Sequence, residues 1–361
     1  MAAPVLRVLA GPRARRLLTE RGWRPEDVRV IPAAAGGPKG LVLGPLDRFV
    51  FGQWLPRSSQ VVHLLGASIG AWRMAAACRQ DPVAALTRLT EDYIAQDYPH
   101  APGKSPTAET VSRVFGAKLA EHFGGAEAEL LAHPRLRLHL FTSRGRHVLG
   151  REGRLRTPLG YGGAFFTNLA SRRALGGWLE RVVFSDPRDP LPLPLHDYRT
   201  HQVGLDAANL QPAVLASCSI PFWLQAVHDI PGAPRGAYWD GGITDYHLHL
   251  RYDRLAGDGL VLYPHFQPSV VPGWLDKLLR HRHRATSALD NVVLLVPHPD
   301  WIARLPGGKL PDRSDFQSFG DDLAGRMARW RAAVQASEAL AEAFAEAVDG
   351  GRPLPIEPLE P

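Results

Sequence analysis

Residues 61–77 read VVHLLGASIGAWRMAAA. In this stretch an apolar run of strand length leads into Gly-x-Ser-x-Gly, and an Ala-rich segment that favours a helix follows. A strand, a sharp turn and a helix in this order can hold a serine hydroxyl clear of the sheet, where it can act as a nucleophile. Ser68 is therefore the candidate nucleophile of this chain.

The two glycines of this turn have a steric role. Gly66 and Gly70 lack a Cβ, so the turn can close tightly and hold Ser68 in a strained backbone conformation. The N-terminus of the following helix would direct free N–H groups and a partial positive charge to the same place, and Ile69 would provide one such N–H. The pentapeptide alone also fits an ordinary glycine-rich turn between a strand and a helix, so the choice depends on the rest of the chain.

A second glycine-rich loop precedes Ser68 by about thirty residues and follows a predicted strand over 27–35. The loop consists of Gly36, Gly37, Pro38, Lys39 and Gly40. Its backbone can approach a carbonyl oxygen closely, and because Pro38 has no N–H, Gly36 and Gly37 are the better donors. Lys39 adds a positive charge nearby. The spacing fits neither the Walker phosphate-binding pattern nor the dinucleotide fingerprint.

The order of elements around these two loops indicates the fold class. Strand, glycine loop, helix, strand, serine turn and helix follow one another within about fifty residues, which is typical of a mainly parallel sheet with helices on both faces. Parallel sheets place their active sites at the carboxyl ends of the strands, where both loops fall. We therefore expect an α/β protein.

The remaining elements are predicted from hydrophobic periodicity and turn residues. Further strands are expected over 4–10, 135–142, 237–239, 259–264 and 291–296, and helices over 12–21, 41–55, 81–96, 107–132, 169–184, 206–217 and 316–348. The strand over 135–142 alternates apolar and polar residues and reads as half-buried. The segment 143–166 fits either a lid loop or a plain hairpin.

Length and composition limit the possible classes. With 361 residues the chain can bury a large core, and we expect one domain over 1–350 and a disordered tail over 351–361. No run approaches the roughly eighteen apolar residues that a membrane-spanning helix needs. The formal net charge of +6 fits an anionic surface or substrate, although arginines on solvated helix faces explain it equally well. No nucleic-acid-binding motif is present, so we expect no nucleic-acid partner.

The cysteines and the N-terminus bear on the compartment. Cys78 and Cys218 lie in apolar segments and read as buried thiols rather than as a disulfide or a metal pair. Residues 1–10 carry an arginine inside a short apolar run, with more arginines after it, which is the wrong order for a secretory signal. We therefore expect a cytoplasmic protein.

A carboxylate that could serve as the base for Ser68 lies much later in the chain. Asp240 follows the aromatic pair Tyr238-Trp239, and Gly241 and Gly242 come after it. Asp-Gly is a common turn signal, so the residue could be purely structural. The aromatic strand favours a base, because it could desolvate the carboxylate and promote proton uptake. Asp245 is a competing carboxylate that reads as a cap.

Three motifs occur in the order Gly36-Gly37-Pro38-Lys39-Gly40, Gly66-Ala67-Ser68-Ile69-Gly70 and Asp240-Gly241-Gly242. In this order they resemble the patatin-like phospholipase family, over residues 27–245, and Ser219-Ile220-Pro221 is also similar to a family segment. The resemblance implies a three-layer α/β/α fold and hydrolysis of acyl esters of lipids by a Ser-Asp dyad.

The resemblance also implies roles for single residues. Ser68 would be the nucleophile and Asp240 the proton acceptor. The oxyanion hole would comprise Gly36, Gly37, Lys39 and Gly40, with Ile69, and the motif glycines would be Gly66, Gly70, Gly241 and Gly242. One departure is that Ala34 and Ala35 stand where the family has Asp and its first Gly. Since alanine is small enough for the turn, we expect the oxyanion hole to persist. Lys39 in place of Arg is a variation the family tolerates.

Histidines after Asp240 allow a rival mechanism, a Ser-Asp-His triad. The candidates are His247, His249, His265 and His298. The short spacing from the glycine loop to Ser68 favours the dyad. The pairs His247/His249 and His281/His283 lack a third ligand at a recognised spacing, so we expect exposed histidines, no metal and no cofactor.

Residues 272–282 are basic and begin near an aromatic residue, which fits either a helix lying on an anionic membrane or a packed surface helix.

The leading hypothesis is a cytoplasmic serine hydrolase of lipid esters, and one form of this hypothesis places the protein at the membrane surface. The alternatives are an esterase, a thioesterase or a polyester hydrolase with the same dyad, and a non-catalytic lipid-binding protein with a vestigial site. Protein partners, head group and acyl length are left open.

Overall fold

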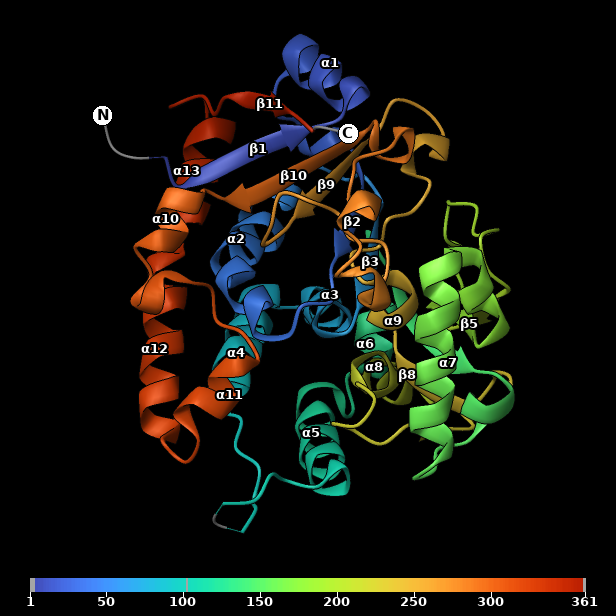
Figure 1. The fold of residues 1–361 in the computed structure, drawn as a ribbon. Helices are drawn as coiled ribbons and strands as arrows, with labels where there is room; N and C mark the ends of the chain where they lie inside the picture. Colours follow the sequence, from blue (N-terminus) through green and yellow to red (C-terminus); the bar gives the residue numbers. More distant parts are fainter. Residues whose placement is uncertain (1–3, 102, 360–361) are drawn as a thin grey trace.

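A mixed sheet runs through the middle of the molecule (Figure 1). The computed structural model describes residues 4–101 and 103–359. Its strands are β1 Leu6–Ala10, β2 Val28–Ala33, β3 Val62–Ala67, β4 Leu136–Gly145, β5 Leu179–Ser185, β6 Thr200–Gly204, β7 Val227–His228, β8 Ala237–Asp240, β9 Leu260–Pro264, β10 Val292–Pro297 and β11 Ile356–Pro358. They are arranged in the order β11-β1-β10-β9-β2-β3-β4-β5-β6, with β8 paired to β4 and β7 to β8.

The α-helices of the described residues alternate with these strands. They are α1 Pro12–Arg21, α2 Gly44–Phe49, α3 Ile69–Ala77, α4 Pro82–Ile94, α5 Ala108–Phe123, α6 Glu127–Leu131, α7 Arg156–Ala170, α8 Leu210–Cys218, α9 Gly242–Asp245, α10 Pro299–Ala303, α11 Ser314–Phe319, α12 Leu323–Ala336 and α13 Glu338–Val348. The helix expected over 41–55 is divided, because a 3₁₀ segment over Gly37–Leu43 precedes α2 and a π turn over Val50–Trp54 follows it.

Strand β3, which leads to Ser68, lies in the middle of the sheet. It pairs in parallel with β2 on one side and with β4 on the other. Most of its side chains are buried, as is usual for a parallel strand covered by helices on both faces. Because the carboxyl ends of β2 and β3 lie at the same edge, the glycine loop and Ser68 meet there, and Gly36 and Ser68 line one cavity.

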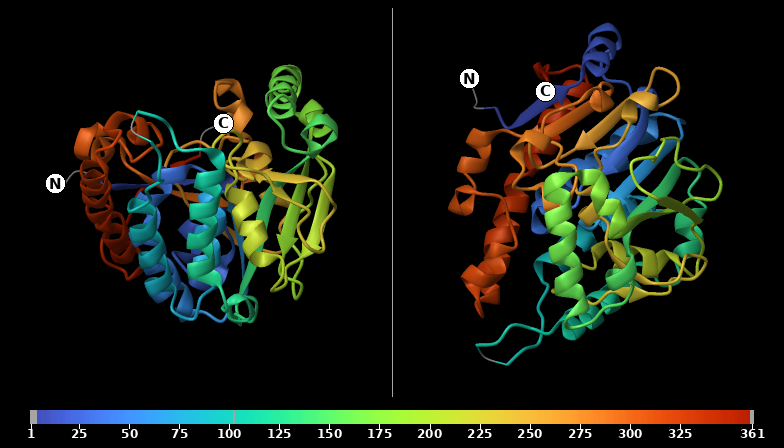
Figure 2. Two further views of the ribbon diagram at one scale, coloured as in Figure 1. Left: turned by 90° about the horizontal axis from the view of Figure 1, so that it is seen from below. Right: turned by 45° about the vertical axis from the view of Figure 1, so that its right-hand side comes forward.

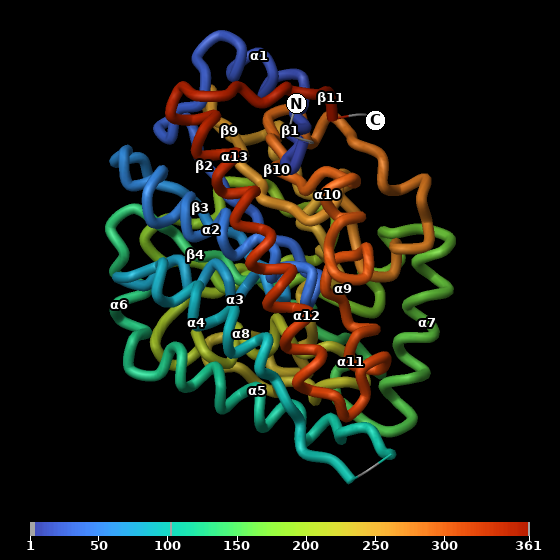
Figure 3. The backbone as a smooth tube through the Cα atoms, turned by 90° about the vertical axis from the view of Figure 1, so that its left-hand side faces the viewer, coloured from blue at the N-terminus to red at the C-terminus, as the bar shows by residue number. Residues whose placement is uncertain are grey.

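Helices cover both faces of the sheet (Figure 2). On one face α3 and α8 contact the central strands, α4 packs on α3, and α5 packs on α8; α12 and α13 lie beside α4 and α2 (Figure 3). On the other face α7 and α9 enclose a second apolar cluster, which includes Tyr161, Leu179, Trp239 and Ile243. The predicted three-layer α/β/α class with a mainly parallel sheet is confirmed.

Strand β4 differs from the half-buried strand expected over 135–142. It is ten residues long and buried along nearly its whole length, including His139 at 0 % exposure. The reason is its position between β3 and β5, with helices above and below. The polar members find partners inside the protein, since His139 Nε2 lies 2.9 Å from His63 Nδ1 on β3.

The region between β4 and β6 was the least well predicted. Neither a lid loop nor a hairpin occupies 143–166, because β4 continues to Gly145 and α7 begins at Arg156. The helix expected over 169–184 is wrong. Its first part is a 3₁₀ segment, Arg172–Gly177, and its second part is β5, whose β-branched Val182 and Val183 suit a buried strand.

Two predictions about the last third also require correction. The helix expected over 316–348 is three helices, because Gly320 adopts a φ of +51° after α11 and the chain breaks again at Ser337 between α12 and α13. The surface helix expected over 272–282 consists of two short 3₁₀ turns, Trp274–Asp276 and Arg280–Arg282.

The C-terminal tail is ordered over part of the range 351–361 in which disorder was expected. Strand β11 pairs in parallel with β1, and Arg7 donates to Glu357 at 2.9 Å. Ile356 and Leu359 pack partly buried against the main core. These apolar contacts and the Arg7–Glu357 pair thus hold β11 in place as an edge strand of the sheet. No helix among residues 4–101 and 103–359 is long and apolar enough to cross a membrane.

Candidate active site

Ser68 lies in a strained turn between β3 and α3. Its φ is 57° and its ψ is −128°, a conformation that is costly for a residue with a side chain. A Cβ on Gly66 would lie 2.5 Å from Ala71 Cα, and a Cβ on Gly70 would lie 1.9 Å from the carbonyl oxygen of Ala33. Both positions of the turn therefore require glycine, as the Gly-x-Ser-x-Gly spacing predicts.

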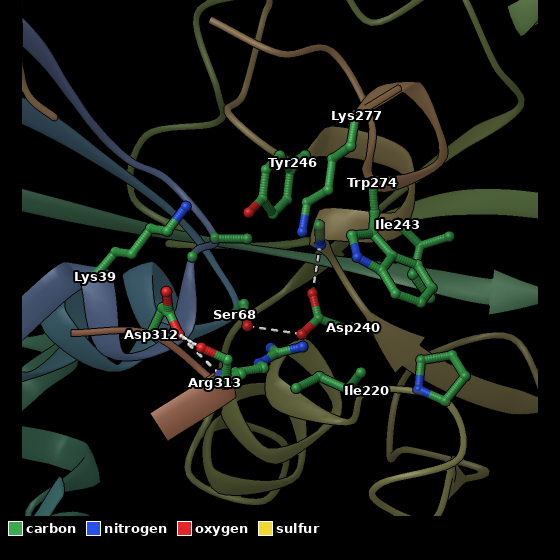
Figure 4. Close-up of a pocket in the computed structure, with 15 residues that line it drawn as sticks. Lys39, Ser68, Ile220, Asp240, Ile243, Tyr246, Trp274, Lys277, Asp312 and Arg313 are labelled. Carbon is green, nitrogen blue, oxygen red and sulfur yellow. Dashed lines mark hydrogen bonds between the residues drawn. The ribbon is translucent and has the colours of Figure 1, made fainter. Parts of the chain in front are cut away.

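Asp240 meets Ser68 at the end of β8. Ser68 Oγ donates to Asp240 Oδ2 at 2.6 Å, and the N–H of Gly242 donates to Asp240 Oδ1 at 2.7 Å (Figure 4). Both side chains are buried. Each carboxylate oxygen thus has one partner, and the side chain is held with one oxygen directed at the serine.

Glycines also surround Asp240. A Cβ on Gly241 would lie 2.0 Å from the carbonyl oxygen of Phe141, and a Cβ on Gly242 would lie 2.6 Å from Ala35 Cβ. These contacts let the turn after β8 approach both β4 and the segment after β2. The Asp240-Gly241-Gly242 sequence is thus a close-packed turn rather than an exposed one.

Residues at the end of α8 hold the two turns together. Ser217 Oγ accepts from the N–H of Ser68 at 3.0 Å and donates to the carbonyl oxygen of Phe141 at 2.7 Å. The N–H of Asp240 donates to the carbonyl of Ser219 at 2.8 Å. Sequence reasoning missed Ser217, although the Ser219-Ile220-Pro221 segment that it singled out begins two residues later.

The environment of Asp240 makes it a stronger base than an ordinary aspartate. Burial raises the pKa of Asp240 to about 6, while the Ser68 hydrogen bond and the positive charge of Arg313 oppose the rise. At neutral pH a carboxylate with a pKa slightly below that pH is largely ionised, and it still accepts a proton readily.

The glycine loop lies beside Ser68. Gly36 and Lys39 line the same cavity as Ser68, and Gly40 packs against Ile69, where an added Cβ would lie 3.4 Å from Ile69 Cγ2. Gly37 adopts a φ of +57°, which favours glycine. Within the described ranges, the N–H groups of Gly36, Gly37 and Ile69 donate to no other protein atom.

The cavity at Ser68 has a volume of about 310 Å³. Its lining residues are Ala35, Gly36, Lys39, Ser68, Ile220, Pro221, Asp240, Gly242, Ile243, Tyr246, Trp274, Lys277, Asp312, Arg313 and Ser314. The wall is apolar on the side of Ile220, Ile243 and Trp274, and Lys39, Lys277 and Arg313 contribute positive charge. Sequence reasoning did not connect 272–277 or 312–314 with Ser68, since no local pattern links these segments to it.

The histidines of the rival triad lie elsewhere. His247 and His265 are buried rather than exposed, and neither lines the cavity. His247 Nδ1 accepts from the N–H of Val271 at 3.0 Å. His298 caps α10, and His249 Nε2 contacts Thr286. No group of three metal-ligating side chains occurs in the described part of the chain.

Comparison with known proteins identifies the family of this chain. A family model described as patatin-like phospholipase matches residues 36–247, which is more than half of the chain and runs from the glycine loop past Asp240. No match is found among curated proteins. The chain belongs to the patatin-like phospholipase family.

Proposed function

We propose that this protein is a serine hydrolase that cleaves acyl esters of lipids with Ser68 as nucleophile and Asp240 as base. The hydrogen bond of 2.6 Å from Ser68 Oγ to Asp240 Oδ2, in a strained turn that opens into a cavity, carries the proposal. Membership in a family of lipid acyl hydrolases supports the choice of lipid esters.

The first half of the reaction forms an acyl-enzyme. Asp240 takes the proton of Ser68 as Oγ bonds to the ester carbonyl carbon, and the carbonyl electron pair moves to its oxygen. When the carbonyl re-forms, the bond to the alcohol breaks and the alcohol receives the proton from Asp240. In the second half, water gives a proton to Asp240, its oxygen attacks the acyl carbon, and Ser68 Oγ leaves with that proton. The products are an alcohol and a carboxylic acid.

Backbone donors would stabilise the negative oxygen that forms in both halves. The N–H groups of Gly36, Gly37 and Ile69 are free of protein acceptors in the described residues and lie on the two turns that meet at Ser68. Preorganised donors of this kind are worth most where charge develops in the transition state. Lys39, on the same loop, would add a positive charge.

The cavity rim supports a peripheral contact with a lipid surface, which we propose as part of this function. Phe222 is 56 % exposed and Trp223 46 % exposed, directly after the cavity-lining Ile220 and Pro221. Leu278 is 84 % exposed and follows the cavity-lining Lys277. We call Phe222, Trp223 and Leu278 the apolar rim. Exposed apolar side chains that follow directly on cavity-lining residues fit a surface that meets a membrane.

A fluorophosphonate probe tests the proposal, because it labels only an activated serine. Labelling of the wild type and none of Ser68→Ala is expected, together with release of fatty acid from phospholipids, lysophospholipids or glycerides. Short p-nitrophenyl esters and thioesters in the same panel separate a lipid hydrolase from a general esterase or a thioesterase. If the wild type is neither labelled nor active on any of these esters, the proposal fails and a non-catalytic lipid-binding protein is favoured.

A further inference from the structure

Three cationic side chains line the cavity without a carboxylate partner. Among the described residues, no carboxylate lies within salt-bridge distance of Lys39, Lys277 or Arg313. Lys277 Nζ lies 4.3 Å from the ring centroid of Tyr246, and Lys39 Nζ lies 5.6 Å from that of Phe266. In Figure 4 the Lys277 side chain points toward the Ser68–Asp240 pair, and Arg313 extends toward the same pair from the opposite side.

The buried Arg73 and Arg181 and the half-buried Arg172 each pair with a carboxylate, whereas the buried Arg326 lies over the rings of Phe316 and Trp330. Arg73 contacts Asp47 at 2.7 Å, Arg181 contacts Asp245 at 2.6 Å, and Arg172 contacts Asp276 at 2.6 Å. A cation removed from water without a partner is costly, so such pairing is the usual solution. The cavity likewise gathers three cations, none of which is paired with a carboxylate of the described residues at salt-bridge distance.

The two carboxylates of the cavity offset only part of this charge. Asp312 Oδ2 accepts from Lys309 Nζ at 2.9 Å, and Asp312 Oδ1 accepts from the N–H of Ser314 at 2.8 Å. Asp240 is occupied by Ser68 and by Gly242. Three cations thus face two carboxylates that already have hydrogen-bond partners. One of the two, Asp312, is also paired with a fourth cation, Lys309.

The cations repel one another. Lys277 is an exposed residue, yet desolvation of its ammonium group and the charges of Arg313 and Lys39 lower its pKa to about 8, and Asp240 opposes the fall. Burial also lowers the pKa of Lys39. An anion bound among the three groups would relieve both the repulsion and the loss of hydration.

We propose that Lys39, Lys277 and Arg313 form an anion subsite that holds a phosphate or carboxylate group of the substrate beside the ester attacked by Ser68. This inference rests on the proposed function. It specifies an anionic head group, because the quaternary ammonium of a phosphocholine would meet three like charges and no free carboxylate. Substrates with a terminal anion should therefore be preferred to zwitterionic and neutral ones.

Two of the three residues lie outside residues 36–247, the part of the chain that matches the family model. The segment that carries Lys277 is fixed by the buried Asp276, which accepts from Arg172 at 2.6 Å and from Asn168 at 2.8 Å. Arg313 directly precedes α11. Most of the subsite is thus built by segments outside the matched range, which suits a role in specificity.

The test compares three substrates with the same acyl chain, namely 1-oleoyl lysophosphatidic acid, 1-oleoyl lysophosphatidylcholine and 1-oleoylglycerol. The wild type should have the highest kcat/KM for lysophosphatidic acid. Lys277→Gln and Arg313→Gln should each lower the ratio of kcat/KM for lysophosphatidic acid to that for 1-oleoylglycerol by about tenfold, mainly through KM. Lys277→Arg should keep the ratio. Lys104→Gln, which removes an exposed lysine outside the cavity, is the matched control.

The ratio decides between the possible outcomes. If Lys277→Gln and Arg313→Gln give the same ratio as Lys104→Gln, the subsite is wrong, although Ser68-dependent hydrolysis of 1-oleoylglycerol would still support the proposed function. Inhibition of 1-oleoylglycerol hydrolysis by inorganic phosphate, without a preference for lysophosphatidic acid, would assign the cations to a free anion and overturn the substrate assignment.

A binding measurement tests the anion subsite independently of the proposed hydrolase activity. Inorganic phosphate should raise the Tm of the inactive Ser68→Ala variant, and should raise it less when Lys277→Gln or Arg313→Gln is added. This result would support the subsite even if the chain proved to hydrolyse no ester. An equal shift with and without the added substitutions would place the phosphate elsewhere and contradict the subsite.

Discussion

Thr142 of β4 lies opposite Asp240 of β8 in antiparallel register. One residue earlier, Phe141 of β4 lies opposite Ala67 of β3, and Ser68 follows Ala67 directly. A single strand thus changes its hydrogen-bonding partner from β3 to β8 between two consecutive residues. This change brings together the serine and the aspartate, which are 172 positions apart in the sequence.

Ser68→Ala and Asp240→Asn should each reduce kcat/KM for a lipid ester by about a thousandfold or more. The first removes the nucleophile, and the second removes the group that accepts its proton while keeping the size and one acceptor oxygen of the side chain. Both variants should keep the wild-type circular dichroism spectrum. Near-normal turnover by Asp240→Asn would show that another residue acts as the base.

The pH profile should reflect Asp240. Because only the ionised carboxylate can take the proton from Ser68, and its pKa is raised to about 6, kcat/KM should increase about tenfold per pH unit below pH 6 and level off above it. For an anionic lipid the value should fall again above pH 8, where Lys277 loses its proton. A plateau that begins near pH 4 would mean that Asp240 is not the titrating base.

Ionisation of Asp240 should also cost stability. Its folded-state pKa lies above the ordinary aspartate value of 3.8, so the folded protein binds the proton more tightly than the unfolded chain, and stability is lost as pH rises from about 4 to about 6. Asp240→Asn removes this loss. Relative to the wild type, the variant should gain about 2–3 kcal/mol in free energy of unfolding between pH 4 and pH 8, measured by urea denaturation. An equal difference at both values would contradict burial of the charge.

The sequence allowed prediction of the glycine-flanked turns that carry Ser68 and Asp240, because steric rules determine where the glycines stand. A Cβ on Gly66 or Gly70 would collide with the backbone. Beside Asp240, a Cβ on Gly241 would collide with the backbone of Phe141, and one on Gly242 with Ala35 Cβ. Such positions leave a pattern in the sequence at fixed spacing. The order of strands and glycine loops likewise indicated a mainly parallel sheet, since connections in such sheets are short and regular.

The rest of the site is set by tertiary contacts that leave no such pattern. Lys277 and Arg313 reach the cavity from segments far from Ser68, and Ser217 acts through one hydroxyl at the end of a helix. The sequence of β5 predicted a helix, because a short apolar run fits the periodicity of a helix as well as that of a strand. Burial of β4 on both faces depended on neighbours that its alternating pattern could not indicate.

Gly70→Ala should destabilise the protein strongly. The new Cβ would lie 1.9 Å from the carbonyl oxygen of Ala33, so α3 or β2 would have to move, at a cost of about 3 kcal/mol or more. Gly162→Ala in α7 is the matched control, because nothing lies within 4 Å of its Cβ position and alanine favours a helix by about 1 kcal/mol. Thermal unfolding should therefore shift down for the first variant and slightly up for the second. Similar Tm values would contradict the close contact of α3 with β2.

The apolar rim should govern binding to lipid surfaces. Phe222→Ser, Trp223→Ser and Leu278→Ser each remove an exposed apolar side chain beside the cavity, so together they should reduce sedimentation of the protein with vesicles of phosphatidylglycerol by about tenfold or more. Val83→Ser is the control, since Val83 is 39 % exposed at the start of α4 and outside the cavity lining. The triple variant should still hydrolyse a short soluble ester, because the Ser68–Asp240 contact does not involve the rim. Equal sedimentation of the wild type and the triple variant at low salt would show that the basic charge of the chain, and not the rim, binds the vesicles.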